Sequence, residues 1–256
     1  MKIRRISLPA AELAKLQASE RNLFFLVGHI NNEISSLSKV FSWCLADARV
    51  AGVAEVELHA ANAQGMMYAR ILAGKLLEAW GALGRSWFAS KLGADISKTL
   101  HPAAADSLEK LKGYFGSKNL IHAVRNSFAF HYDAGALGEH WERAATEPVF
   151  ELIIGINRGN SFHQAAELVT NVSVFHTIAP GDAQAGMAAF FKDLDYVSEQ
   201  FRNFCEGVTR AILERLSGMN LDNLGGLSDI APPRKVSEVT IPVFCQPEEE
   251  IDGIVP

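Results

Sequence analysis

The chain has 256 residues, of which 48% are hydrophobic and 21% charged, and this balance predicts a globular protein rather than a disordered one. Its formal net charge of −5 argues against a general nucleic-acid binder but leaves room for a local basic patch. The cysteines Cys44, Cys205 and Cys245 are far apart, which favours free thiols in a reducing compartment. The longest apolar run near the N-terminus, 23–27, is too short to span a bilayer. We therefore expect a soluble, cytoplasmic protein with no membrane segment.

Apolar residues recur at helical spacing through the first part of the chain. The apolar pattern from about residue 10 to 48 predicts two helices or one bent helix, and Gly52 breaks this pattern. A second long helix is expected from about 57 to 92. Each glycine inside it costs about 1 kcal/mol relative to alanine, which is tolerable where a neighbouring helix must approach closely. These glycines are Gly65, Gly74, Gly81 and Gly84.

Shorter helices are predicted next. Asp106 is a candidate N-cap for a helix that reaches Tyr114, because its carboxylate can accept a hydrogen bond from a free backbone N–H. Asn119 is the candidate cap of the following helix, which Gly135 ends. A short helix around 137–146 follows.

The periodicity then changes. Residues 149–156 are rich in β-branched residues and predict one short strand or extended segment. Ser161 and Gln164 have the spacing of a capping box at the start of a helix that runs to about Phe175.

The last long helix is predicted from Asp182, as its cap, to about 217–218. Residues 226–256 contain proline and end in an acidic run, 248–252, which predicts an extended acidic tail. The chain is therefore expected to be mainly all-α, an up-and-down bundle of long antiparallel helices that forms a single domain over residues 1–225.

Common motifs for bound cofactors and metals are absent from the sequence. It contains no glycine-rich phosphate loop, no G-x-S-x-G elbow and no zinc motif such as H-E-x-x-H. His29 and Glu33 are four residues apart on one helical face, but two ligands are weak grounds for a metal site. We expect neither a metal nor a cofactor.

The segment 121–133, I-H-A-V-R-N-S-F-A-F-H-Y-D, is apolar enough to be buried yet contains Arg125, His122 and His131. The planar fork of an arginine matches a phosphate and keeps its charge near neutral pH. A histidine can give or take a proton near pH 7. Together they suit metal-free cleavage of RNA, in which the histidine moves protons and the arginine stabilises charge on the phosphoryl group.

The stretch from Arg125 to His131, R-N-S-F-A-F-H, resembles the R-N-x(3–5)-H signature of the HEPN superfamily, with a spacing that this signature allows. The resemblance implies an all-α bundle, with a HEPN-like core around residues 57–178. It also implies a homodimer in which two motifs face one cleft. Many members are metal-independent endoribonucleases of toxin–antitoxin or phage-defence systems, so RNA and an antitoxin protein are the expected partners.

Carried over by position, Arg125 and His131 are the expected catalytic pair, and Asn126 is the polar residue that follows the arginine. We take Lys118, His122 and Tyr132 as candidate substrate-binding residues because they flank that pair. A wider basic cluster that includes Lys110 and Lys112 could steer a phosphate backbone, although a solvated helix face is the simpler interpretation.

Two alternatives remain open from the sequence. In the first, the chain is a non-catalytic HEPN-like module that binds a nucleotide, RNA or a protein. Arg125 is then tied to Asp133, Glu139 or another acid, because buried charges need partners. In the second, the chain is a helical oligomerisation protein with a large apolar interface.

Overall fold

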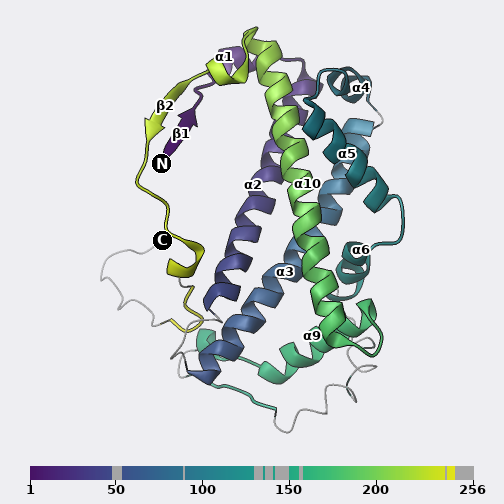
Figure 1. Ribbon diagram of the computed structural model, residues 1–256, viewed down its shortest axis with the longest axis vertical. Coiled ribbons are helices and arrows are strands. Elements are labelled where there is room, and N and C mark those ends of the chain that lie inside the picture. Colours follow the sequence, from purple (N-terminus) through teal and green to yellow (C-terminus); the bar gives the residue numbers. More distant parts are fainter. Residues whose placement is uncertain are drawn as a thin grey trace.

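The computed structural model describes most of the chain, and everything below refers to these residues: 1–47, 54–88, 90–129, 135, 141, 150–155, 158–239 and 241–245. The described part is mainly helical, with long helices that run up and down one axis (Figure 1). The predicted fold class, a mainly all-α bundle of long antiparallel helices, is confirmed.

The N-terminal region forms two helices, α1 (Ala10–Leu13) and α2 (Ala18–Asp47). The predicted second long helix is α3 (Glu55–Leu83), which continues into a π-helical turn, η1 (Gly84–Phe88). A separate helix, α4 (Lys91–Ser97), starts where the prediction still placed the long helix. Ser90 caps α4 by accepting a hydrogen bond from the Gly93 backbone N–H at 2.9 Å.

The next helices are α5 (Pro102–Phe115) and α6 (Leu120–Val124). Asp106 is not a cap, because α5 begins four residues earlier, where His101 Nδ1 accepts a hydrogen bond from the Ala103 N–H and proline occupies the first helical position. The cap at Asn119 is confirmed, since its Oδ1 accepts from the His122 N–H at 2.9 Å. The predicted helix at 137–146 lies largely outside the described residues.

Two long helices follow, α9 (Gln164–Ile178) and α10 (Ala183–Ser217). Asp182 caps α10 as predicted, by accepting from the Ala185 N–H at 2.9 Å, and Gly218 ends the helix in the left-handed conformation that favours glycine.

The predicted capping box at Ser161 and Gln164 is wrong. The Ser161 hydroxyl accepts from the Gly155 N–H at 3.3 Å instead of capping α9.

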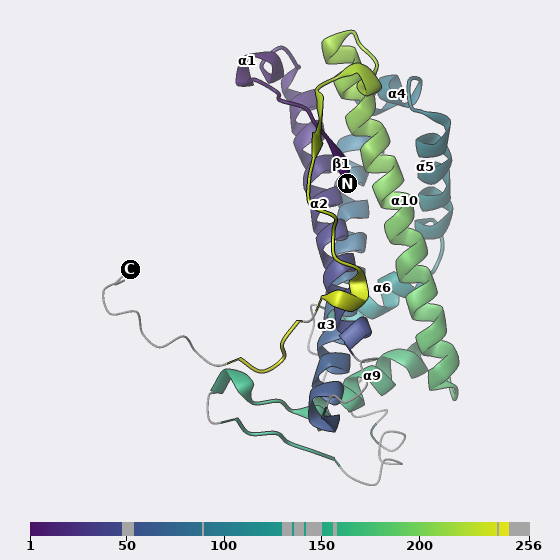
Figure 2. The same cartoon turned by 60° about the vertical axis from the view of Figure 1, so that its left-hand side comes forward.

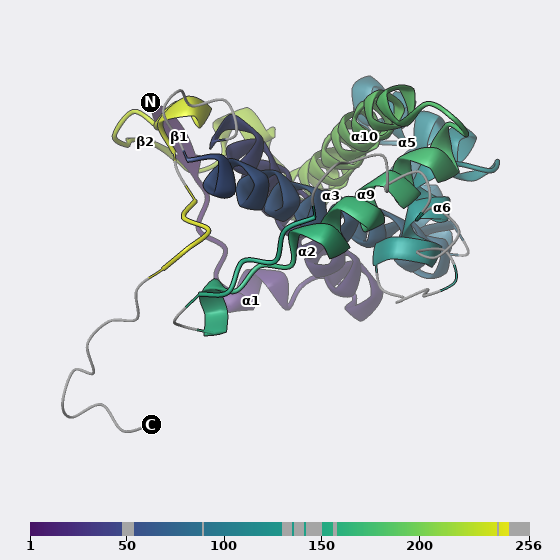
Figure 3. The ribbon, with the colours of Figure 1, turned by 90° about the horizontal axis from the view of Figure 1, so that it is seen from below.

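The predicted extended segment lies next to a short 3₁₀ turn, η3 (Arg158–Asn160). Its described residues, 150–155, make one β-bridge between Ile153 and Phe162, with reciprocal backbone hydrogen bonds of 2.9 and 2.8 Å. Figure 3 shows the two segments that flank η3 side by side.

The two strands of the described chain come from its N-terminal residues and from the segment that follows α10. β1 (Lys2–Arg5) pairs antiparallel with β2 (Gly226–Asp229), with Ile3 opposite Ser228. The 3₁₀ turns η4 (Leu221–Asn223) and η5 (Val236–Glu238) precede and follow β2. In Figure 2 this pair and the segment after it pass in front of α2. The first residues of the predicted tail, from 226, are thus tied to the N-terminus.

The core is organised around one face of α10. Its buried apolar residues recur every three or four positions, which keeps them on one stripe of the helix. α10 contacts α2, α3, α5, α6 and α9. The stripe comprises Phe190, Leu194, Val197, Phe201, Phe204, Val208 and Ile212.

α5 packs against α10 very closely. A Cβ added at Gly207 would lie 2.2 Å from the Ala104 Cβ, so glycine sets the separation of the two helices there. Polar contacts reinforce the interface: the Ser107 hydroxyl donates to Gln200 Oε1 at 3.0 Å, and the Tyr114 hydroxyl donates to Asp193 Oδ2 at 2.7 Å. Burial and this hydrogen bond raise the pKa of Tyr114.

No described helix is both long and apolar enough to cross a membrane.

We predict that Gly207→Ala lowers the free energy of unfolding by about 1–3 kcal/mol, because the added methyl group overpacks the α5–α10 contact. Gly28→Ala is the control. Its Cβ would meet nothing within 4 Å inside α2, so it should raise stability by about 1 kcal/mol. Urea denaturation measures both. Equal changes in the free energy of unfolding for the two variants would contradict the close approach of α5 to α10 at Gly207.

We also predict that one thiol reacts quickly in the native protein. Cys245 is exposed, whereas Cys44 and Cys205 are buried, and burial also raises the pKa of the Cys205 thiol. Titration with a thiol-specific chromogenic disulfide should therefore show a fast phase that Cys245→Ser removes, and slow phases that appear fully only in denaturant. A fast phase that survives Cys245→Ser would contradict this assignment.

Candidate functional site

The motif begins at the junction of α6 with a π-helical turn, η2 (Arg125–Ala129). Asn119 sets the start of α6, and η2 and α6 both pack against α3. A π turn is rare and often occurs at functional sites, since its wider backbone reorients the side chains that it carries. Arg125 is the first residue of this turn and so lies where the helical geometry changes.

Arg125 is bound to an acid from another helix. Its Nη2 lies 2.7 Å from Oε1 of Glu78 on α3, and 28% of the arginine side chain and 55% of the glutamate side chain are exposed. The pair matches the expectation that Arg125 is tied to an acid, although the acid is neither Asp133 nor Glu139, which lie outside the described residues.

A chain of hydrogen bonds extends from Arg125 back along α6. Its Nη1 donates to Asn126 Oδ1 at 3.2 Å, and Asn126 Nδ2 lies 3.2 Å from Nδ1 of His122. An arginine can only donate, so the Asn126 oxygen faces it and the amide nitrogen must donate to the histidine. His122 Nδ1 is then the acceptor, which places the ring proton of a neutral His122 on Nε2.

The structure thus brings together three of the predicted residues, Arg125, Asn126 and His122. Lys118 is exposed in the turn before α6 and makes no hydrogen bond or ion pair with any residue in the described part. His131 and Tyr132 lie outside the described residues.

The sequence interpretation missed Glu78. It is 47 residues before Arg125, and no local pattern links the two positions.

The two lysines of the predicted basic cluster that lie on α5 are paired within this helix. Lys110 Nζ lies 2.7 Å from Asp106 Oδ2, and Lys112 Nζ lies 2.7 Å from Glu109 Oε1. Such exposed pairs within one helix contribute little stability, but they offset the positive charge of the lysines.

Arg85 is a further arginine, which the sequence interpretation did not consider. It is exposed on η1, its Nη1 lies 3.8 Å from where a Cβ on Gly81 would be, and it has no hydrogen-bond or ion-pair partner in the described chain. Arg85 is seven residues after Glu78 along α3 and its continuation, so it follows on the same helical face as the acid that binds Arg125.

A second arginine in α3 provides a structural comparison. Arg70 has an 8% exposed side chain, and it donates from Nη1 to Asn171 Oδ1 at 2.6 Å and from Nη2 to Glu167 Oε2 at 2.9 Å. Both partners are on α9, so Arg70 joins two helices through a largely buried network. Arg125 is more exposed, and its acid is mostly in solvent.

Metal ligation finds no support among the residues that the structure describes, because no three His, Cys, Asp or Glu side chains gather closely enough to hold an ion. His29 Nε2 lies 3.7 Å from Glu33 Oε2, while Lys75 Nζ lies 2.6 Å from Glu33 Oε1. The positive charge of Lys75 offsets the negative charge of Glu33, which a bound cation would need.

We predict different costs for removing the two arginines. Arg70→Met should lower the free energy of unfolding by about 2–3 kcal/mol, because it leaves the partly exposed Glu167 carboxylate and the Asn171 amide without their nearly buried donor. Arg125→Met should cost about 1 kcal/mol or less, as for other exposed pairs. Urea denaturation measures both. A cost for Arg125→Met as large as that for Arg70→Met would mean that Arg125 holds the bundle together.

Comparison with known proteins adds no relative: no family model, no curated protein and no solved structure matches the chain significantly.

Proposed function

We propose that this chain acts on RNA, with Arg125 as the residue that contacts a backbone phosphate. The supporting observation is the partly exposed network Glu78–Arg125–Asn126–His122, which orients a guanidinium at the surface of the bundle. A guanidinium bound to a carboxylate is already arranged for a phosphate, which presents the same pair of oxygen acceptors. RNA binding then exchanges one acceptor for another.

The more specific proposal is metal-independent cleavage, in line with the resemblance to HEPN endoribonucleases. A base removes the proton from a 2′-hydroxyl, and that oxygen attacks the adjacent phosphorus. The bond to the 5′-oxygen breaks, and an acid donates a proton to this leaving group. The products are a 2′,3′-cyclic phosphate and a 5′-hydroxyl. We assign proton transfer to His131 and stabilisation of the charged phosphoryl oxygens to Arg125.

A non-catalytic RNA-binding module is the second candidate. It is favoured by the ion pair with Glu78, because this carboxylate competes with the substrate for the arginine in the resting protein. In both proposals the protein works in the cytoplasm, and in the first it is a homodimer whose two motifs share a cleft and whose activity an antitoxin protein could restrain.

The first experiment measures cleavage of a labelled mixed-sequence RNA in EDTA and, in parallel, RNA binding by fluorescence anisotropy. We expect Arg125→Ala to weaken binding about tenfold, which corresponds to about 1.4 kcal/mol. We also expect the slope of log affinity against log salt concentration to become shallower by about 0.7, because the variant neutralises one phosphate fewer. His131→Ala should abolish cleavage and leave binding nearly unchanged.

Two further variants control for charge. Arg234→Ala removes an exposed arginine that has no partner among the described residues, and it should alter neither binding nor cleavage. Glu78→Gln removes the competing carboxylate and should tighten binding. Binding without cleavage supports the module rather than the enzyme. Equal binding by the wild type, Arg125→Ala and Arg234→Ala overturns the proposal.

A further inference from the structure

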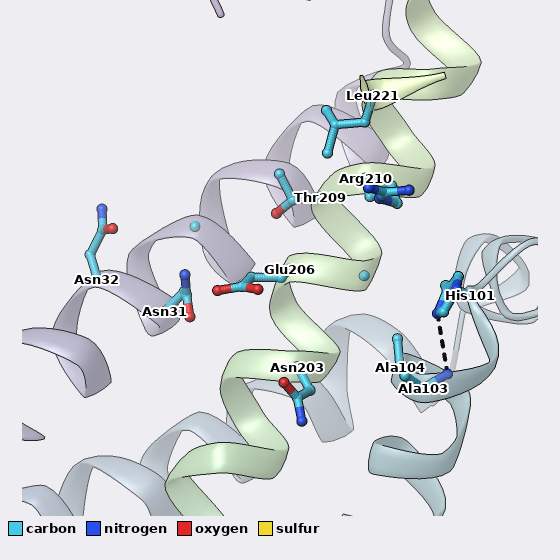
Figure 4. A pocket seen from close by; sticks show the side chains of 12 residues that line it. Asn31, Asn32, His101, Ala103, Ala104, Asn203, Glu206, Thr209, Arg210 and Leu221 are labelled. Carbon is cyan, nitrogen blue, oxygen red and sulfur yellow. Dashed lines mark hydrogen bonds between the residues drawn. The ribbon is translucent and has the colours of Figure 1, made fainter. Parts of the chain in front are cut away.

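A polar groove of about 690 Å³ lies on another part of the bundle, away from Arg125. α10 forms its floor, α2 one wall, and the start of α5 the other wall (Figure 4). Gly28 on α2 contributes no side chain to the groove, and a Cβ there would meet nothing within 4 Å.

Four polar side chains of the groove have no partner among the described residues. No hydrogen bond or ion pair joins the side chains of Asn32, Asn203, Glu206 and Thr209 to any other residue in the part of the chain that is described. Thr209 differs from two other threonines on helices in the hydrogen bonding of its hydroxyl. Thr170 and Thr177 donate to the carbonyl oxygens four residues earlier at 2.7 and 2.8 Å, whereas Thr209 makes no such bond.

Asn31 adds an acceptor that lacks a donor. Its Oδ1 is enclosed and has no hydrogen-bond partner, which costs about 1–3 kcal/mol for a buried polar group. Figure 4 shows the Glu206 carboxylate of α10 pointing toward Asn31 of α2. Asn31 Oδ1 and the Glu206 carboxylate are therefore two acceptors of this groove that no described side chain satisfies.

The charge of the groove is negative. Arg210 also lines it, but its Nη2 lies 3.3 Å from Asp222 Oδ1 and its Nη1 lies 3.7 Å from Glu214 Oε1, so its charge is offset. The first backbone N–H groups of α5 are taken by His101, which accepts from Ala103 through Nδ1 and from Ala104 through its carbonyl oxygen. Neither the Arg210 guanidinium nor the first N–H groups of α5 are therefore available to an anion. The Glu206 carboxylate makes the charge of the groove negative.

We propose that this groove binds an organic ammonium group, with Glu206 as its counter-ion and the amides of Asn31 and Asn203 as further acceptors. An ammonium presents three N–H donors and no acceptor. It would supply the donors that Asn31 and Glu206 lack, once the Asn31 amide rotates so that its enclosed Oδ1 reaches the groove. The same ammonium could come from a free polyamine or from a lysine side chain of a peptide.

Isothermal titration calorimetry of the full chain with spermidine tests the proposal, with tri-lysine as the peptide source and sorbitol as a neutral polyol. We expect Glu206→Gln to weaken spermidine binding about tenfold, equivalent to about 1.4 kcal/mol. Asn203→Ala should weaken it about threefold. Tighter binding of tri-lysine than of spermidine would assign the groove to a protein side chain and would still support an ammonium site.

Glu199→Gln is the matched control. Glu199 is also exposed on α10, two turns before Glu206, and it does not line the groove. The variant removes the same charge and should leave the affinity within about twofold. Equal losses in Glu206→Gln and Glu199→Gln would mean non-specific attraction. That result, no binding of either amine, or binding of sorbitol as tight as that of spermidine would overturn the proposal.

Discussion

The packing of other helices on α10 is the constraint on which the rest of the structure depends. α10 contacts α2, α3, α5, α6 and α9. At two of its glycines the neighbouring helix approaches α10 closely. A Cβ at Gly207 would collide with α5, and one at Gly186 would lie 2.2 Å from the Phe175 carbonyl oxygen of α9. The position of α6, and with it Arg125, follows from this packing because α6 lies against both α3 and α10.

Features set by local chemistry were predictable from the sequence. Asn119 and Asp182 cap helices because a side-chain acceptor next to a free N–H acts within three residues. The two wrong caps have a local origin as well. Pro102 is pre-organised for the first turn of α5, so the helix starts before Asp106, and Ser161 uses its hydroxyl in the turn beside Gly155.

Long-range pairs could not be predicted in this way. Arg125 was identified from its own segment, but its partner Glu78 depends on how α3 and α6 pack, which no spacing in the sequence encodes. The pairing of β1 with β2 is a similar case, since four mostly exposed residues at each end of a helical chain give no pattern of their own. The groove beside Glu206 likewise forms only when three helices meet.

The two proposed binding regions require opposite charges, and this reconciles the acidic chain with an RNA substrate. The net charge of −5 describes the whole molecule, while a phosphate or an ammonium responds mainly to groups within about 8–10 Å at physiological salt. Arg125 belongs to the network on α3 and α6, whereas Glu206 lines the groove between α2, α5 and α10. Under the two proposals, a phosphate and an ammonium would therefore each meet a different set of charged groups.

The contact between β1 and β2 has a consequence for the order of folding. It joins two segments that are far apart in the sequence, and the Arg4 guanidinium donates to the Leu224 carbonyl oxygen across 220 residues. Closing so long a loop costs entropy that four mostly exposed pairs cannot offset by themselves. The helices must therefore assemble first and bring the two ends together. The ribbon forms as a late step, and its amide hydrogens should be among the first in the fold to exchange with solvent.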